Sequence, residues 1–230
     1  MNPRPVAREG VIGQAILPGA KVGVIIEIGC DTAFVARDEG FRAFADEAAR
    51  RIAIEPGADL EDDRRRLEQM MEEPIMIRHS ARFEVASHGA VATYIHTGGK
   101  VGVIVEVGAT KDETVTTNVF QQLARDVTLQ IAAANPLCVD RSWVPGATLE
   151  REREIYRNQI PPGKQADIVE KIVHGRIEQF YGGVCLVEQA FIKNPDQTIA
   201  QLIAARSKEL GDELLIRRFL RYSVGKEIAG

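Results

Sequence analysis

Residues 19–29 read GAKVGVIIEIG, and residues 98–108 read GGKVGVIVEVG. Eight of the eleven positions are identical, and the other three only exchange alanine for glycine or isoleucine for valine. The same offset of 79 residues (98 − 19) pairs residues 19–53 with residues 98–132 without a gap. A match of this length predicts that the chain contains an internally duplicated structural unit.

Each copy of this unit begins with two short runs rich in β-branched residues. The runs cover residues 10–17 and 22–28 in the first copy, and residues 89–96 and 101–107 in the second. A glycine-containing turn joins each pair, which predicts two β-hairpins. Apolar side chains then recur at helical spacing, so a helix is expected to pack on each hairpin. These side chains belong to Phe41, Phe44, Ala45, Ala48 and Ile52 in the first copy, and to Phe120, Leu123, Ala124, Val127 and Ile131 in the second.

A third predicted strand is also repeated, but at a larger offset. Residues 75–86 align without gaps to residues 214–225, an offset of 139 (214 − 75). The second copy therefore carries an insertion of 60 residues (139 − 79) between its helix and its third strand. Within this insertion, residues 149–159 and 166–181 are helix-prone, and a Pro-Pro-Gly break separates them. They predict an antiparallel helical hairpin, either an interaction arm or an ordinary packed extension.

The predicted fold class is therefore α+β. It consists of internally duplicated ββα…β units with antiparallel sheets and helices packed on them, plus the inserted helical hairpin. The expected organisation is a linker remnant at residues 1–9, a first core subdomain at 10–88, a second core subdomain at 89–135 and 197–228, and a helical hairpin arm at 136–196.

Composition argues against several classes of protein. A net charge of −4 over 230 residues provides no overall basic field for nucleic acid or anionic lipid, so neither partner is expected. The sequence contains no apolar stretch of about 18 residues, so membrane insertion is not expected. The N-terminus does not resemble an export signal, so export is not expected either. The odd number of scattered cysteines, Cys30, Cys138 and Cys185, predicts free thiols and a reducing, cytoplasmic location.

The sequence contains no recognisable motif for catalysis. Gly98-Gly99-Lys100 lacks both the spaced first glycine and the following hydroxyl residue of a phosphate-binding loop. The four histidines do not have the spacing of a zinc site. No catalytic residue, cofactor or metal is therefore expected.

The two copies differ most where the second strand joins the helix. This segment reads CDTAFVAR at residues 30–37 and ATKDETVT at residues 109–116. Phe34 in the first copy either packs in its own core or anchors a partner, and the pattern leaves both possibilities open.

The run EIGCDTAFVAR at residues 27–37, followed by GFRAFA at residues 40–45, closely resembles the E-V-N-C-Q-T-D-F-V-A-K signature of the elongation factor Ts family. The resemblance implies a guanine-nucleotide exchange factor of protein biosynthesis, without covalent catalysis, that binds elongation factor Tu and promotes GDP release in the cytoplasm. It extends, in the order of the family, to residues 8–10, 75–78, 168–176 and 188–191.

The resemblance also implies which residues bind the partner. In the family, the loop that matches Thr32, Ala33, Phe34 and Val35 intrudes beside the magnesium site of the GTPase, and the helical arm makes a second contact. The further partner-binding candidates are Asp31, Gln130, Ile168, Val173 and Ile177.

Three departures from the family pattern bear on this assignment. Ala33 stands where the family motif has aspartate. In an extended loop Asp31 would point to the same side as Ala33, and is expected to substitute partly for it. Gln130 occupies a position where some members carry histidine at the partner interface. The small N-terminal helical domain of the family does not precede the linker, so one docking surface is expected to be absent.

Other functions stay open beside the exchange factor. A diverged paralogue would bind the GTPase or another protein without exchanging its nucleotide. A small-molecule enzyme on the same scaffold would require a convergent polar pocket. A homodimer is also possible, because pairing would restore contact area to a short chain.

Overall fold

The computed structural model describes residues 8–226. The predicted linker lies almost wholly outside the described residues, as do residues 227 and 228 of the predicted second subdomain.

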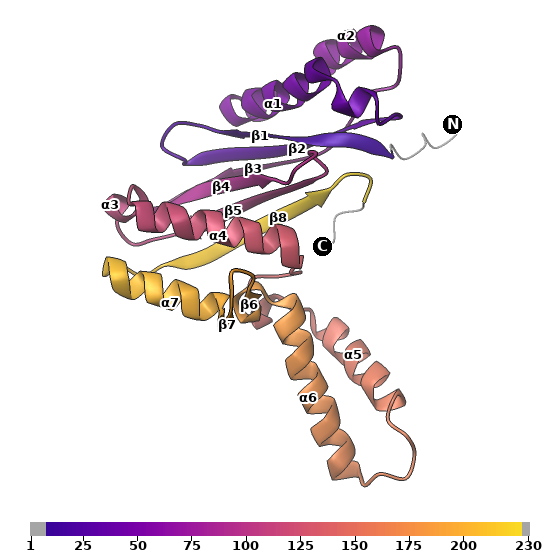
Figure 1. Cartoon of the computed structure of the whole chain (residues 1–230), viewed down its shortest axis with the longest axis vertical. Coiled ribbons are helices and arrows are strands. Elements are labelled where there is room, and N and C mark those ends of the chain that lie inside the picture. The colour runs from indigo at the N-terminus through magenta and orange to yellow at the C-terminus, as the bar shows by residue number, and fades with distance from the viewer. Residues whose placement is uncertain (1–7, 227–230) are drawn as a thin grey trace.

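Figure 1 shows four stacked layers, in the order helices, sheet, sheet, helices, and a helical pair that projects from one end of the stack. The predicted α+β class, with antiparallel sheets and helices packed on them, is confirmed. Within residues 8–226, no helix is both long and apolar enough to span a bilayer.

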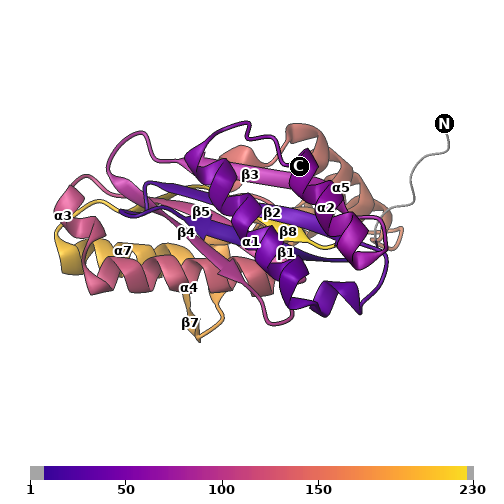
Figure 2. The same ribbon diagram turned by 90° about the horizontal axis from the view of Figure 1, so that it is seen from above.

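The first sheet has the strand order β1-β2-β3, with antiparallel pairing throughout. Two helices lie over its outer face, as Figure 2 shows from above. The central strand β2 is buried along almost its whole length because both faces of the sheet are covered. The elements of this half are β1 (Glu9–Ile16), β2 (Val22–Cys30), η1 (Val35–Arg37), α1 (Glu39–Ile54), α2 (Glu61–Met71) and β3 (Met76–Glu84).

The second sheet has the equivalent order β4-β5-β8, again antiparallel. Two long helices, α4 and α7, cover its outer face (Figure 1). The elements of this half are β4 (Gly89–Ile95), β5 (Val101–Gly108), α3 (Asp112–Val115), α4 (Asn118–Ala134), α7 (Ile199–Leu210) and β8 (Leu215–Ser223).

The segment between α4 and α7 contains the two predicted helices and more. Its helices α5 and α6 run side by side away from the stack (Figure 1). A short β-hairpin that was not predicted follows them, because its strands are too short and polar to show alternation. The subdomain boundaries stay a prediction. The elements are η2 (Arg141–Trp143), α5 (Gly146–Asn158), α6 (Ala166–Val184), η3 (Leu186–Glu188), β6 (Ala190–Phe191) and β7 (Asn194–Thr198).

The two large sheets meet face to face through reciprocal contacts. The backbone N–H of Ile12 donates to the carbonyl of Gly99 at 2.8 Å, and that of Val91 donates to the carbonyl of Ala20 at 2.7 Å. Both the donors (91 − 12) and the acceptors (99 − 20) are 79 residues apart, as the sequence repeats are. Reciprocal contacts of this kind are what an approximate twofold axis between the sheets produces. The origin of the two halves by duplication stays a prediction.

Each sheet also buries one carboxylate of its central strand in an ion pair. Glu27 is 1% exposed and accepts from Arg78 at 2.9 Å. Glu106 is 4% exposed and accepts from Arg217 at 3.1 Å and from Arg218 at 2.8 Å. In both sheets the strand register shifts directly after this glutamate. The two halves therefore share an internal ion pair at corresponding positions, and removing one partner would leave a buried charge uncompensated.

Glycines in the central strands allow the sheets to approach each other. A Cβ atom on Gly23 would lie 2.5 Å from Cγ1 of Val91, and a Cβ atom on Gly102 would collide with Cγ2 of Ile12. Each glycine thus receives a β-branched side chain from the opposite sheet.

We expect Gly23→Ala to destabilise the fold by about 1–3 kcal/mol, the usual cost of overpacking a close contact. Urea unfolding followed by circular dichroism would measure the change. Gly146→Ala at the start of α5 is the matched control, because a Cβ atom there meets no neighbour within 4 Å. Equal stability of the Gly23 variant and the control would contradict this account of the sheet interface.

Candidate functional site

The loop between β2 and η1 exposes a large aromatic side chain. Phe34 is 85% exposed, the highest value among the large hydrophobic residues in the described part of the chain. Thr32 and Ala33 are also exposed, whereas the next residue, Val35, is 3% exposed and packs in the core beneath α1. Phe34 therefore does not pack in its own core, and its side chain is free to contact a partner. Val35 presents almost no side-chain surface in this conformation, and its contact with a partner stays a prediction.

The loop is a turn and not the extended segment that was expected. Phe34 has helical backbone angles (φ −67°, ψ −54°). The N–H of Ala36 donates to the carbonyl of Thr32 at 3.2 Å, and that of Val35 donates to Oγ1 of Thr32 at 3.3 Å. Alternation of side chains does not apply to a turn, so the argument that placed Asp31 on the same side as Ala33 loses its basis, and partial substitution by Asp31 stays a prediction.

Glu73 holds the start of this loop from the segment that follows α2. Its carboxylate accepts three hydrogen bonds: from the N–H of Asp31 at 3.1 Å, the N–H of Thr32 at 3.2 Å and Oγ1 of Thr32 at 2.9 Å. Hydrogen bonds to an ionised group are stronger than neutral ones, so they fix the backbone that leads to Phe34. Sequence reasoning missed Glu73.

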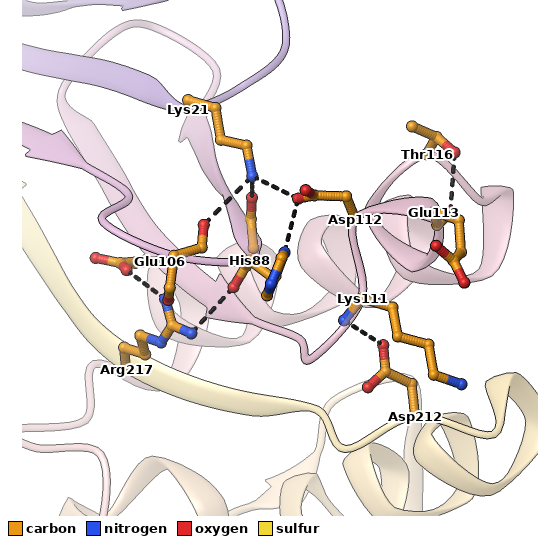
Figure 3. Close-up of polar contacts among 11 residues, drawn as sticks. Lys21, His88, Glu106, Lys111, Asp112, Glu113, Thr116, Asp212 and Arg217 are labelled. Carbon is orange, nitrogen blue, oxygen red and sulfur yellow. Dashed lines mark hydrogen bonds and ion pairs between the residues drawn. The ribbon is translucent and has the colours of Figure 1, made fainter.

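A corresponding carboxylate holds the corresponding loop of the second sheet. Asp212 accepts from the N–H of Thr110 at 3.0 Å and from Oγ1 of Thr110. It also accepts from the N–H of Lys111 at 3.2 Å (Figure 3). Desolvation opposes ionisation, but the hydrogen bonds from Thr110 and Thr114 outweigh it and hold the pKa of Asp212 below its ordinary value. Glu73 and Asp212 both lie two residues before the aligned third-strand segments, and this shared acidic position is the signal that could have identified Glu73.

The second loop, in contrast, is tied to the first sheet by surface contacts. Nζ of Lys21, from the β1–β2 turn, donates to the carbonyl of Gly89 at 3.1 Å and to the Asp112 carboxylate at 3.2 Å. His88 Nδ1 lies 3.1 Å from the same carboxylate oxygen (Figure 3). The bonds from His88 and Lys21 lower the pKa of Asp112. This loop thus joins the two sheets, and only the first loop exposes an aromatic side chain.

The arm residues that were predicted to bind a partner differ in their accessibility. Ile168, on the first turn of α6, is 41% exposed. Val173 and Ile177, farther along α6, are 2% and 3% exposed. In this conformation only Ile168 of the three presents a substantial apolar surface, and the other two stabilise the arm itself.

Gln130 has an internal role and not a surface one. Its side chain is fully buried on α4. Nε2 donates to Gln189 Oε1 at 3.1 Å and to the carbonyl of Ala190 at 3.2 Å, while Oε1 accepts from the N–H of Ile192 at 2.9 Å. These bonds anchor the β6–β7 hairpin to α4. Gln130 therefore has no exposed surface with which to make the expected contact with a partner in this conformation.

Ionic and aromatic contacts fasten the base of the arm. The Arg141 guanidinium pairs with Glu178 at 2.6 Å and also with Glu188, and its central carbon lies 4.3 Å from the ring centroid of Tyr181. These residues belong to η2, α6 and η3. The contacts join the segments before and after the helical pair to α6, and so fasten the base of the arm together.

Comparisons with known proteins agree with the resemblance noted in the sequence. A family model described as "Elongation factor TS" matches residues 31–226. The chain is 34% identical over 237 residues to the elongation factor Ts of Trichlorobacter lovleyi, covering 96% of the chain and 76% of that relative. It is 37% identical to that of Clostridium botulinum strain Alaska E43 and 38% identical to that of Clostridium perfringens, each over 97% of the chain and 77% of the relative.

Proposed function

The chain belongs to the elongation factor Ts family, and we propose that it binds the GTPase elongation factor Tu and accelerates the release of GDP. The observation that carries this proposal is the exposed Phe34 on a turn that Glu73 holds in place. A large aromatic side chain presented on a fixed backbone loses little entropy on binding, which suits a residue that inserts into a partner.

Nucleotide exchange by this route requires no covalent step. If the protein binds the nucleotide-free GTPase more tightly than the GDP-bound form, linkage requires that it weakens GDP binding by the same factor. The side chain of Phe34 would supply this difference by occupying space beside the magnesium site only when the GTPase has opened. The protein is in this proposal an exchange factor and not an enzyme in the covalent sense, and it acts in the cytoplasm with translation.

The arm would provide a second contact with the GTPase. Ile168 is an accessible apolar residue of the arm, and the ionic contacts of Arg141 fasten the base of the arm. Two contacts on one molecule raise the overall affinity for the partner, because once the first has formed the second forms at a high effective concentration.

A second candidate is binding without exchange, and Ala33 is the observation that favours it. No carboxylate stands at position 33, and the loop is a turn, in which alternation does not place Asp31 beside Ala33. A loop that inserts only Phe34 could dock on the GTPase without disturbing its metal.

Stopped-flow release of a fluorescent GDP analogue from elongation factor Tu tests the proposal. We expect the native chain to accelerate release many-fold, with a rate that saturates as the chain concentration rises. Tight binding in calorimetry with an unchanged release rate would select the second candidate, and neither binding nor acceleration would refute both. Light scattering on the free chain would show whether it acts as a homodimer.

A further inference from the structure

Two cysteine side chains lie in contact at the base of the arm. The sulfur atoms of Cys138 and Cys185 are 3.7 Å apart, although 47 positions separate these residues in the chain. Cys185 directly follows α6, and its backbone forms an isolated parallel β-bridge with Cys138. Both are free thiols. The fold therefore brings together two thiols that look unrelated in the sequence.

We propose that Cys138 and Cys185 are a reversible disulfide site that fastens the base of the arm. Residues in a β-bridge have backbones about as close as a disulfide requires, and the sulfur atoms must approach to about 2.05 Å. From 3.7 Å, this needs rotation of side chains and not displacement of an element. The inference does not depend on the proposed exchange activity.

The chemistry that forms this bond is thiol–disulfide exchange with a small-molecule disulfide. The Cys138 thiolate is the attacking group, because its side chain is partly exposed whereas that of Cys185 is fully buried. Its attack forms a mixed disulfide and releases one small thiolate. The Cys185 thiolate then attacks the Cys138 sulfur and releases the second. The protein loses two electrons and two protons, which leave in the two small thiols.

Burial makes this pair slow to react. It raises the pKa of both thiols, that of Cys185 to about 12. Since the thiolate is the nucleophile, the rate is expected to rise with pH through the neutral and alkaline range. A metal site is a poorer interpretation of the pair, because residues 8–226 contain no group of three or more His, Cys, Asp or Glu residues that could hold a metal ion.

The bond would reinforce a short backbone ladder that already closes the arm. The N–H groups of Leu137 and Cys138 donate to the carbonyl of Val184, and the N–H of Leu186 donates to the carbonyl of Cys138 at 2.9 Å. A disulfide at the same level would oppose local opening of this ladder, so oxidation would restrict movement of the arm relative to α4.

Incubation of the full chain with oxidised glutathione at about pH 8, followed by alkylation under denaturing conditions and mass spectrometry, tests the proposal. We expect the protein to lose about 2 Da, the mass of the two hydrogen atoms removed. Only Cys30 should then be alkylated, and digestion should yield a peptide that links Cys138 to Cys185. Amide hydrogen exchange at residues 184–187 should become slower after oxidation.

Matched variants separate this pair from unspecific oxidation. Cys30→Ser should still lose the two hydrogen atoms, since Cys30 is buried and its sulfur contacts the carbonyl of Thr32. Cys185→Ser should form no internal crosslink. Chain unfolded in urea, treated identically, shows that the reagent is active. The proposal would be overturned if the folded chain kept three alkylatable thiols while the unfolded chain formed disulfides, or if the crosslink involved Cys30.

Discussion

Replacing Phe34 with alanine is expected to reduce the acceleration of GDP release by about 30-fold or more, the effect of losing an interfacial anchor worth about 2 kcal/mol. The side chain is 85% exposed in the free protein, so its removal should change the free energy of unfolding by less than about 0.5 kcal/mol. The loss would therefore come from the complex with the GTPase and not from the fold. Stopped-flow release of labelled GDP, together with urea unfolding, measures both quantities.

Ile54→Ala is the matched control for the Phe34 variant. Ile54 is also an exposed large hydrophobic residue, at 58%, and it lies at the opposite end of α1, the helix that follows the loop. Its removal should leave GDP release unchanged. An unaltered release rate with Phe34→Ala, or an equal loss with both variants, would show that the loop does not act through its aromatic side chain.

Glu73→Ala is expected to raise the concentration of the chain needed for half-maximal GDP release by about tenfold. The change removes the acceptor of three hydrogen bonds from Asp31 and Thr32, so the turn that presents Phe34 would be populated only part of the time. Apparent affinity falls by the fraction of molecules in the competent conformation. The maximal rate at saturation should change less, because binding selects the same turn.

Asp212→Ala provides the control for a general loss of stability. Asp212 likewise accepts hydrogen bonds from the second loop, which exposes no aromatic side chain. We expect this variant to lose stability in urea while its half-saturating concentration stays close to that of the native chain. Glu73→Gln should recover part of the affinity, since the amide retains one acceptor oxygen. Equal shifts in Glu73→Ala and Asp212→Ala would mean that the carboxylate at position 73 acts only through stability.

Much of the architecture could be predicted from local patterns. The repeated apolar runs predicted the strands and the helices that carry Phe41 and Phe120, both fully buried in the structure. The two offsets also predicted where additional chain enters the second half. These signals are readable because an element that packs on one face must repeat apolar side chains at its own period.

The candidate site could be predicted only in part. The family signature located the loop, but it did not distinguish Phe34, which is exposed, from Val35, which is buried. A turn places neighbouring side chains on different sides without a fixed period, so the sequence carries no signal for that difference. The family resemblance also assigned Gln130 and Val173, which lie on helices, to a partner surface, and the structure places both side chains in the interior.

The sequence by itself determined the strands, the helices on them, the inserted hairpin and the family to which the loop belongs, because each depends on neighbours along the chain. Only the tertiary structure decided which side chains act together. Glu73 and Asp31 are 42 residues apart, and Cys138 and Cys185 are 47 apart, yet each pair is in contact. Such contacts depend on how the layers stack and where the arm closes, and no local period records the distance between two segments after folding.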